Sequence, residues 1–125
     1  MNAHASVSEM PQSERPLSEQ FRLVANSWVD ADAKARELEG LKDLLLEQRK
    51  NALVLAAQRR GEKLADNAAE REVKASDQWM DYITGMIHAR TLANKHKVEM
   101  ERIRMREREI ADHNANIRAE YRLSR

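Results

Sequence analysis

This sequence contains no cysteine, three glycines and two prolines, and its few aromatic residues make up 4% of 125 positions. Without cysteine the chain has neither disulfides nor thiolate metal sites, which fits a reducing compartment. So few aromatic residues beside 34% charged ones do not suit a compact globular core. The composition favours long amphipathic helices, because most of the chain is free of helix breakers.

Long apolar runs are missing as well. No run approaches the roughly 20 residues of a membrane span, and the first residues lack a hydrophobic signal segment. We therefore expect a cytoplasmic protein without membrane contact. The net charge of +1 gives no general attraction to nucleic acid.

Motifs that carry chemistry are also absent. The glycines are isolated, so there is no phosphate-binding loop, and no serine lies in a nucleophile elbow. His4, His88, His96 and His113 are not spaced with carboxylates as metal ligands, and the Glu-x-x-His pairs of di-iron bundles are missing. We expect no catalytic, metal or cofactor site and no enzymatic activity.

The stretch from residue 76 to residue 122 predicts one long helix. It contains no proline, and Ser76 is a suitable N-cap with Asp77 in the first turn. A seam of residues recurs at alternating steps of four and three, which is typical of helices wound around each other. The seam consists of Tyr82, Met86, Ala89, Ala93, His96, Met100, Ile103, Glu107, Ile110, Asn114, Ile117 and Tyr121.

Polar residues in this seam allow two interpretations. Asn114 falls at a position where a buried amide fixes register and partner number, or else the seam is solvated towards its C-terminal end. The second interpretation is favoured. His96 is predicted to be packed or half-exposed rather than a ligand or a base.

An earlier stretch predicts a first long helix over residues 18–60, with Ser18 as its N-cap. Its apolar spacing slips in phase near Gly40, which predicts a bend or a close helix contact there. The leucines at 44–46 follow one another and cannot all face one partner, which suggests a dimer. The seam before the slip consists of Phe21, Val24, Trp28, Ala31, Ala35 and Leu38.

Residues 61–75 are predicted to form the tip of an antiparallel hairpin. Gly61 follows cations in the last turn of the first helix, and Asp66 looks like the cap of a short helix. The hairpin would bring residues 30–47, with six acids and three bases, opposite residues 90–108, with seven bases and three acids. We expect ion pairs between these stretches.

The fold class is therefore all-α: two long helices in an antiparallel coiled-coil-like hairpin with a short helix at the tip. Residues 1–16 are predicted to be a flexible tail and residues 17–125 one helical domain. A homodimeric four-helix bundle is the preferred assembly, and the part beyond Met105 is expected to project. The extra apolar residues assigned to the dimer contact are Trp79, Ile83, Ile87, Leu92, Leu44 and Leu46.

The densest charge run contains Arg102, Arg104, Arg106 and Arg108 with interleaved glutamates. One interpretation is a DNA-binding helix. However, Arg102 and Arg106 lie on one side of a helix and Arg104 and Arg108 on another, and no aromatic residue is interleaved for base stacking. A solvated helix that pairs its charges is the favoured interpretation.

Four short stretches, 69–79, 89–94, 100–105 and 118–123, together resemble small helical proteins of tailed bacteriophages and prophages. Those proteins are encoded in early regions, among recombination and replication genes. The resemblance implies an accessory protein of phage DNA metabolism, or one that blocks a host nuclease or defence system. It provides no catalytic residues to transfer.

The residue patterns thus predict a non-enzymatic protein that binds a partner through exposed helix faces, and the resemblance implies that the partner is a phage or host protein. The candidate partner-binding residues are Arg71 and Lys74 at the tip and Arg118 and Arg122 near the end. Direct DNA binding through the arginine-rich helix is one alternative, and a structural or scaffolding coiled coil is another.

Overall fold

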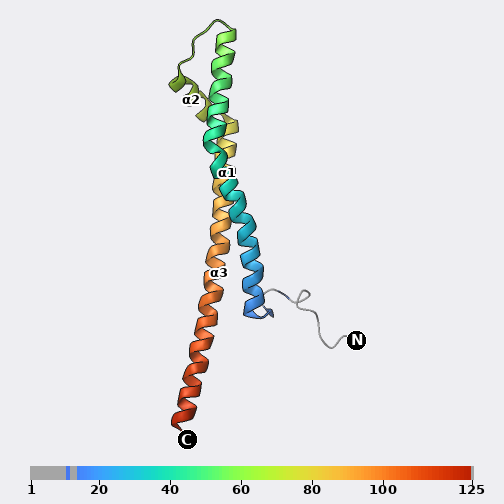
Figure 1. Ribbon diagram of the computed structural model, residues 1–125, viewed down its shortest axis with the longest axis vertical. Helices are drawn as coiled ribbons and strands as arrows, with labels where there is room; N and C mark the ends of the chain where they lie inside the picture. The colour runs from blue at the N-terminus through green and yellow to red at the C-terminus, as the bar shows by residue number, and fades with distance from the viewer. Residues whose placement is uncertain (1–10, 12–13, 125) are drawn as a thin grey trace, which may run out of the picture. The chain divides into compact units, whose positions relative to one another are not determined.

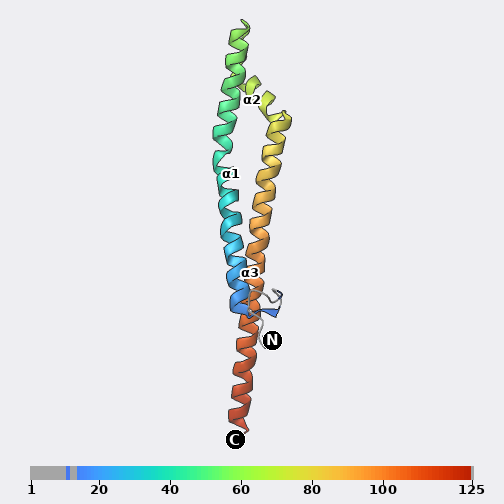
Figure 2. The same ribbon diagram turned by 90° about the vertical axis from the view of Figure 1, so that its right-hand side faces the viewer.

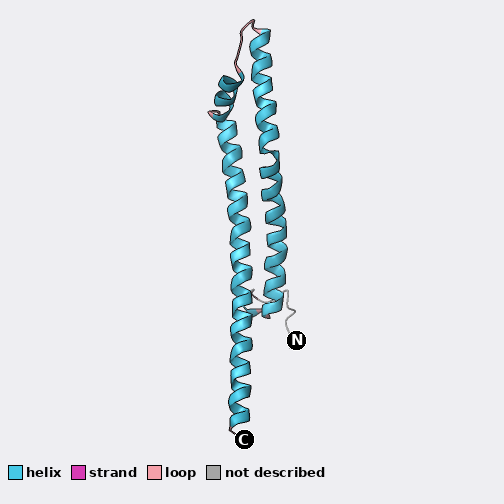
Figure 3. Ribbon diagram, turned by 60° about the vertical axis from the view of Figure 1, so that its left-hand side comes forward, coloured by secondary structure: helices cyan, strands magenta, loops and turns pink. Residues whose placement is uncertain are grey.

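The computed structural model describes residue 11 and residues 14–124, which contain three α-helices (Figure 1). These are α1 (Leu17–Arg59), α2 (Asp66–Lys74) and α3 (Asp77–Leu123). No strand occurs in this part of the chain (Figure 3). The predicted all-α class, with two long helices that pack against each other, is confirmed. Most of the predicted flexible tail, residues 1–10 and 12–13, lies outside the described residues.

Contacts within the chain group it into two units. The central unit is Ala31–Ala93, and the terminal unit combines the residues up to Asp30 with those from Asn94 onward. Each long helix contributes to both units, and each unit is described by itself below.

The N-terminus of α1 differs from the sequence prediction. The helix begins at Leu17, and the amides of Glu19 and Gln20 donate to the carbonyl of Pro16 at 3.0 and 2.9 Å. Pro16 therefore precedes the helix, and Ser18 lies inside the first turn. The prediction of Ser18 as the N-cap was wrong because the cap position is Pro16, two residues earlier.

The C-terminus of α1 follows the prediction. Gly61 has a φ of 73°, a left-handed conformation that glycine adopts without steric cost. The amides of Gly61 and Glu62 donate to the carbonyls of Gln58 and Ala57 at 3.0 and 2.9 Å. These paired bonds are the usual way in which a helix ends at a glycine.

The two caps predicted around α2 have different outcomes. Ala65, in an extended conformation, precedes α2, and no side chain caps the helix. The predicted Asp66 cap was therefore wrong, since the Asp66 carboxylate accepts a 2.9 Å bond from Lys50 Nζ instead. Ser76 does cap α3: its hydroxyl accepts from the Trp79 amide at 3.2 Å and donates to the Val73 carbonyl at 2.6 Å.

Small side chains dominate the core of the central unit. Ala35, Ala69 and Ala93 are completely buried, which lets neighbouring backbones approach closely. Trp79 is 4% exposed, and its ring stacks on Tyr82 with 5.9 Å between centroids. At Gly40 an added Cβ would meet nothing within 4 Å, so the predicted close helix contact at this glycine was wrong.

The predicted dimer face is partly occupied within the chain. Trp79 is buried in the central unit and is not available to a second hairpin. Leu46 and Ile83 are half-buried. Leu44 and Ile87, each 54% exposed, remain on the surface, as does Leu92 at 50%.

In the terminal unit, the start of α1 packs on α3 only as far as the latter's residue 104. Val24 and Ile103 are buried, and His96 is half-buried beside a small cavity of about 90 Å³. The Arg104 guanidinium lies 4.8 Å from the centroid of the Phe21 ring, a cation–π contact. Beyond this point α3 continues past the first turn of α1 (Figure 2), and every described residue from 104 to 124 is exposed.

Candidate interaction surfaces

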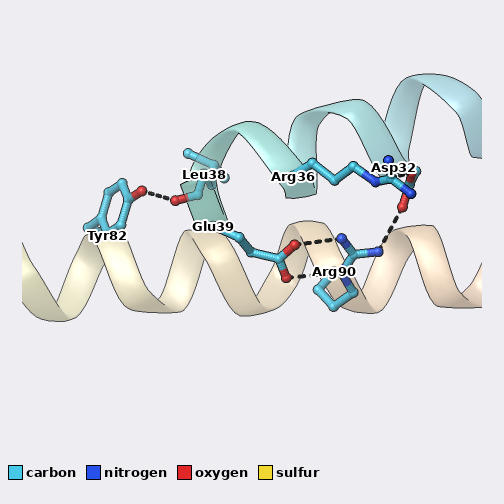
Figure 4. A network of polar contacts seen from close by, with 6 residues as sticks. All are labelled: Asp32, Arg36, Leu38, Glu39, Tyr82 and Arg90. Carbon is cyan, nitrogen blue, oxygen red and sulfur yellow. Dashed lines mark hydrogen bonds and ion pairs between the residues drawn. The ribbon is translucent and has the colours of Figure 1, made fainter. Parts of the chain in front are cut away.

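A cluster of ion pairs joins α1 to α3 in the central unit (Figure 4). The Arg90 guanidinium donates to Asp32 at 2.8 Å and to both oxygens of Glu39 at 2.6 and 3.1 Å. Arg36 contacts the same Asp32 carboxylate at 2.9 Å. The hydrogen bond from Arg90 holds the pKa of the Glu39 carboxyl below its ordinary value. Opposite charges thus lie side by side, and the cluster holds α1 and α3 together.

Tyr82 adds a hydrogen bond to the same contact. Its hydroxyl donates to the backbone carbonyl of Leu38 on α1 (Figure 4). Burial, and secondarily the charge of Glu37, raise the pKa of the phenol. Tyr82 therefore remains a protonated donor rather than a base.

Lys50 holds the start of α2 against α1. Its side chain is 7% exposed, and its Nζ contacts Asp66 at 2.9 Å and Glu47 at 3.2 Å. Hydrogen bonds to Asp66 and then Glu47 raise the pKa of this amine. The paired charge positions α2, and with it one wall of the groove described next.

An open groove of about 450 Å³ lies between α1, α2 and the first turn of α3. Its lining is mostly apolar, and two of the lining residues are joined by a 2.7 Å hydrogen bond from Arg49 to Gln78. Glu72 adds a carboxylate on the α2 side, so the rim carries both charge signs. We call it the α2 groove. It is lined by Arg49, Ala52, Leu53, Glu72, Val73, Ser76 and Gln78.

The predicted tip residues lie near this groove but do not line it. Arg71 and Lys74 are exposed on α2. Lys74 pairs with Glu70 one turn earlier at 3.2 Å, whereas Arg71 forms no ion pair with any described residue. The residues of α2 that do reach the groove are Glu72 and Val73.

The predicted residues near the C-terminal end share one surface. Arg118 and Arg122 flank a shallow hollow of about 330 Å³ together with Ile117 and Tyr121. All four lie on α3, and Ile117 and Tyr121 are 49% and 66% exposed. Cations therefore border an apolar surface at this end of α3.

The arginine-rich stretch forms fewer ion pairs than its interleaved charges suggested. Arg104 stacks on Phe21. Arg102, Arg106 and Arg108 are exposed, and among the described residues none of the three forms an ion pair. Ion pairs were predicted between the basic stretch 90–108 and the acidic stretch 30–47. Arg90 is the residue of the basic stretch that forms them among the described residues, with Asp32 and Glu39.

Comparisons with family models, curated proteins and solved structures find no match to this chain. None of the helices in the described part of the chain has the length and apolarity to cross a membrane. Likewise, residues 11 and 14–124 contain no group of three or more histidine, aspartate or glutamate side chains placed to hold a metal ion.

Sequence reasoning did not find the α2 groove. Its lining comes from three helices, whereas the sequence pointed to the segment 61–76 as a surface and singled out only its cations Arg71 and Lys74. A usable signal was present: the spacing of Ala69 and Val73 gives α2 a buried face, and Glu72 lies at one edge of that face.

Proposed function

We propose that this chain is a non-enzymatic interaction protein, an antiparallel helical hairpin that binds a partner protein in the α2 groove. The order of contacts in the central unit supports the hairpin. Arg49 contacts Gln78, Leu38 contacts Tyr82 and Asp32 contacts Arg90, so partner numbers rise along α3 as they fall along α1. The helices that carry the groove would thus be held in place by the ion cluster of Arg90.

The single observation that carries the proposal is the composition of the groove. Its lining combines the apolar side chains of Leu53 and buried Val73 with the polar or charged side chains of Arg49, Glu72 and Gln78. Binding energy in protein interfaces concentrates in a few apolar anchors that fill such pockets, while polar groups at the rim give orientation. The occupant we propose is an apolar side chain presented by a helix or extended segment of another protein.

The biological setting follows from the resemblance to early proteins of tailed bacteriophages. We place the partner among phage recombination or replication proteins, or among host nucleases and defence proteins that this chain would inhibit. Binding would then occur in the cytoplasm of the host cell. The charged rim of the groove suits a soluble protein partner.

The test compares two arginine substitutions that differ only in the face of α1 on which they lie. Ala52→Arg places a long cation in the groove, whereas Asn51→Arg places one on a residue outside the groove lining. Both positions are exposed, and arginine is a good helix former, so both variants should keep the wild-type circular dichroism.

The immobilised full chain is incubated with lysate of phage-infected cells, and the recovered proteins are quantified by mass spectrometry. We expect the partner retained by wild type and Asn51→Arg to fall at least roughly tenfold with Ala52→Arg, because a buried clash and an unpaired charge oppose docking. Equal recovery by Ala52→Arg and wild type would refute the groove as the binding site.

Direct DNA binding is a second candidate, favoured by one observation. Arg102, Arg106 and Arg108 are exposed and carry no ion pair with described residues, so their charges are available to phosphates. Fluorescence anisotropy of labelled single- and double-stranded DNA at low and physiological salt tests this. Binding that weakens steeply with salt, and weakens further in Arg102→Gln/Arg106→Gln, would move this candidate ahead of the first.

A further inference from the structure

The exposed segment of α3, residues 104–123, carries an apolar seam whose large side chains are about half exposed or more. Ile110 and Ile117 are 46% and 49% exposed, and Tyr121 is 66% exposed. These three residues continue the alternating spacing that ends, in the packed part of the helix, at buried Ile103. A repeat of this spacing is suited to a second helix of the same kind.

The geometry of the terminal unit shows why this seam is uncovered. Arg104 lies over Phe21, and α1 begins at Leu17, only about one turn beyond Phe21. The helix that covers Ile103 therefore ends where the exposed segment begins. Among the described residues, no second helix packs on α3 from about Glu107 to its end, where every residue is exposed.

We infer that the exposed segment of α3 pairs in antiparallel orientation with the exposed segment of a second copy of this chain. This pairing is distinct from the α2 groove of the proposed function. Its charges allow self-association: residues 104–124 contain five arginines and four acidic residues, a net charge of +1 with His113 neutral. Two copies thus repel each other little, and neither requires a partner of opposite charge.

Sterics select the antiparallel orientation. In a parallel pair the second helix would run along the same seam towards His96 and Ile103, where α1 already packs. A parallel pair would also bring the Glu107 side chains of the two copies face to face, and these two negative charges repel each other. An antiparallel helix instead ends close to the start of α1, and the two exposed segments cover each other without displacing it.

One antiparallel register covers the large apolar residues of the seam. Ile110 of each copy lies opposite Tyr121 of the other, and Asn114 lies opposite Ile117. All three large apolar residues of the seam are then covered. The charged residue Glu107 lies at the edge of the overlap, where its carboxylate stays hydrated.

The residues that flank the seam agree with this register. His113 of one copy lies beside Glu120 of the other, and the contact occurs twice by symmetry. Arg118 lies beside Ala111, so no like-charged pair is formed. Arg104, which already contacts Phe21, stays outside the overlap.

The contact is short. The layers from Ile110 to Tyr121 span less than two heptads, about 16 Å of helix, and interfaces of this size belong to the weak class. We therefore expect a dissociation constant in the micromolar range and a mass that depends on concentration.

Analytical ultracentrifugation of the full chain, from micromolar to millimolar concentration, tests the association. Ile117→Lys places a charge in the seam, and Ala119→Lys adds the same charge on the opposite side of the helix. We expect wild type and Ala119→Lys to dimerise alike and Ile117→Lys to do so at least roughly tenfold more weakly. A wild-type monomer at millimolar concentration would overturn the inference and leave the seam to a different molecule.

Disulfide cross-linking tests the orientation, and the chain has no cysteine of its own to interfere. In the antiparallel register two copies of Ile110→Cys hold their thiols about 16 Å apart along the helix, too far for a disulfide, which needs Cα atoms within about 7 Å. Ile110→Cys mixed with Tyr121→Cys brings the thiols into one layer.

We expect cross-linked dimers from that mixture and not from Ile110→Cys alone. Efficient cross-linking of Ile110→Cys with itself would establish a parallel pair and refute the proposal. Ala52→Arg, which blocks the α2 groove, should dimerise as wild type does, so that failure of either proposal leaves the other intact.

Discussion

The central unit and the exposed segment of α3 carry similar apolar repeats but have different surroundings. In the central unit Ala35 and Ala93 are fully covered, and Arg90 joins α3 to two carboxylates of α1. In the exposed segment, Ile110 and Ile117 keep nearly half of their surface in contact with solvent. An apolar seam therefore shows only that a helix can pack on this face of α3. Small buried residues and matched charges decide whether that helix comes from the same chain.

The comparison is tested most strongly by removing one aromatic side chain from each region. Trp79→Ala deletes a ring that is 4% exposed and should lower the free energy of unfolding by roughly 3–5 kcal/mol. Tyr121→Ala deletes one that is 66% exposed and should change it by less than about 0.5 kcal/mol in dilute solution. Urea unfolding followed by circular dichroism measures both, and equal losses would show that the regions do not differ in this way.

A smaller and opposite effect is expected at Gly40, on the open side of the packed region. Gly40→Ala should raise the free energy of unfolding by about 1 kcal/mol, because alanine is the better helix former and its Cβ meets nothing within 4 Å. Gly61→Ala is the control, and it should destabilise because φ is 73° there. A loss of stability in Gly40→Ala would mean that the glycine has a contact of its own.

The smallest effect concerns pH. The hydrogen bond from Arg90 lowers the pKa of Glu39 from its ordinary value of 4.5. A carboxyl whose pKa is lower in the folded state stabilises it above the unfolded pKa, and this stabilisation is lost as the pH falls through the folded value. Glu39→Gln should therefore be less stable than wild type at neutral pH, with the difference shrinking in acid.

Glu120→Gln in the exposed segment provides the matched control for that measurement. It should show little difference from wild type at either pH in dilute solution, because the exposed Glu120 carboxylate forms no ion pair with a described residue, whereas Glu39 pairs with Arg90. Denaturation midpoints across the acid range distinguish the two variants. A Glu39→Gln curve parallel to wild type at every pH would argue against a stabilising pair with Arg90.

Residues that mark helix ends in the sequence were reliable where their bonding partners lie only a few residues away. Gly61 ends α1 and Ser76 caps α3 as expected, since each acts on backbone groups within a few residues. Asp66 was predicted as a cap by the same reasoning and failed, because Lys50, 16 residues away, takes its carboxylate. A distant partner outcompeted the local bond.

Surfaces were harder to predict than helices. The opposition of acidic and basic stretches was foreseen, but the selection of Asp32 and Glu39 by Arg90 depends on the rotation of both helices. The α2 groove depends on how three helices meet, which periodicity does not specify. The sites proposed from exposed cations, Arg71 and Lys74 among them, remain predictions.

The contacts of the central unit also have a consequence for the order in which it folds. Sequence separation is 16 residues for Lys50 with Asp66 and 29 for Arg49 with Gln78, and it grows to 44 for Leu38 with Tyr82 and 58 for Asp32 with Arg90. Closing a shorter loop costs less conformational entropy. We therefore expect folding to nucleate beside Gly61 and to proceed outward like a zipper, with the Arg90 cluster among the last contacts to form.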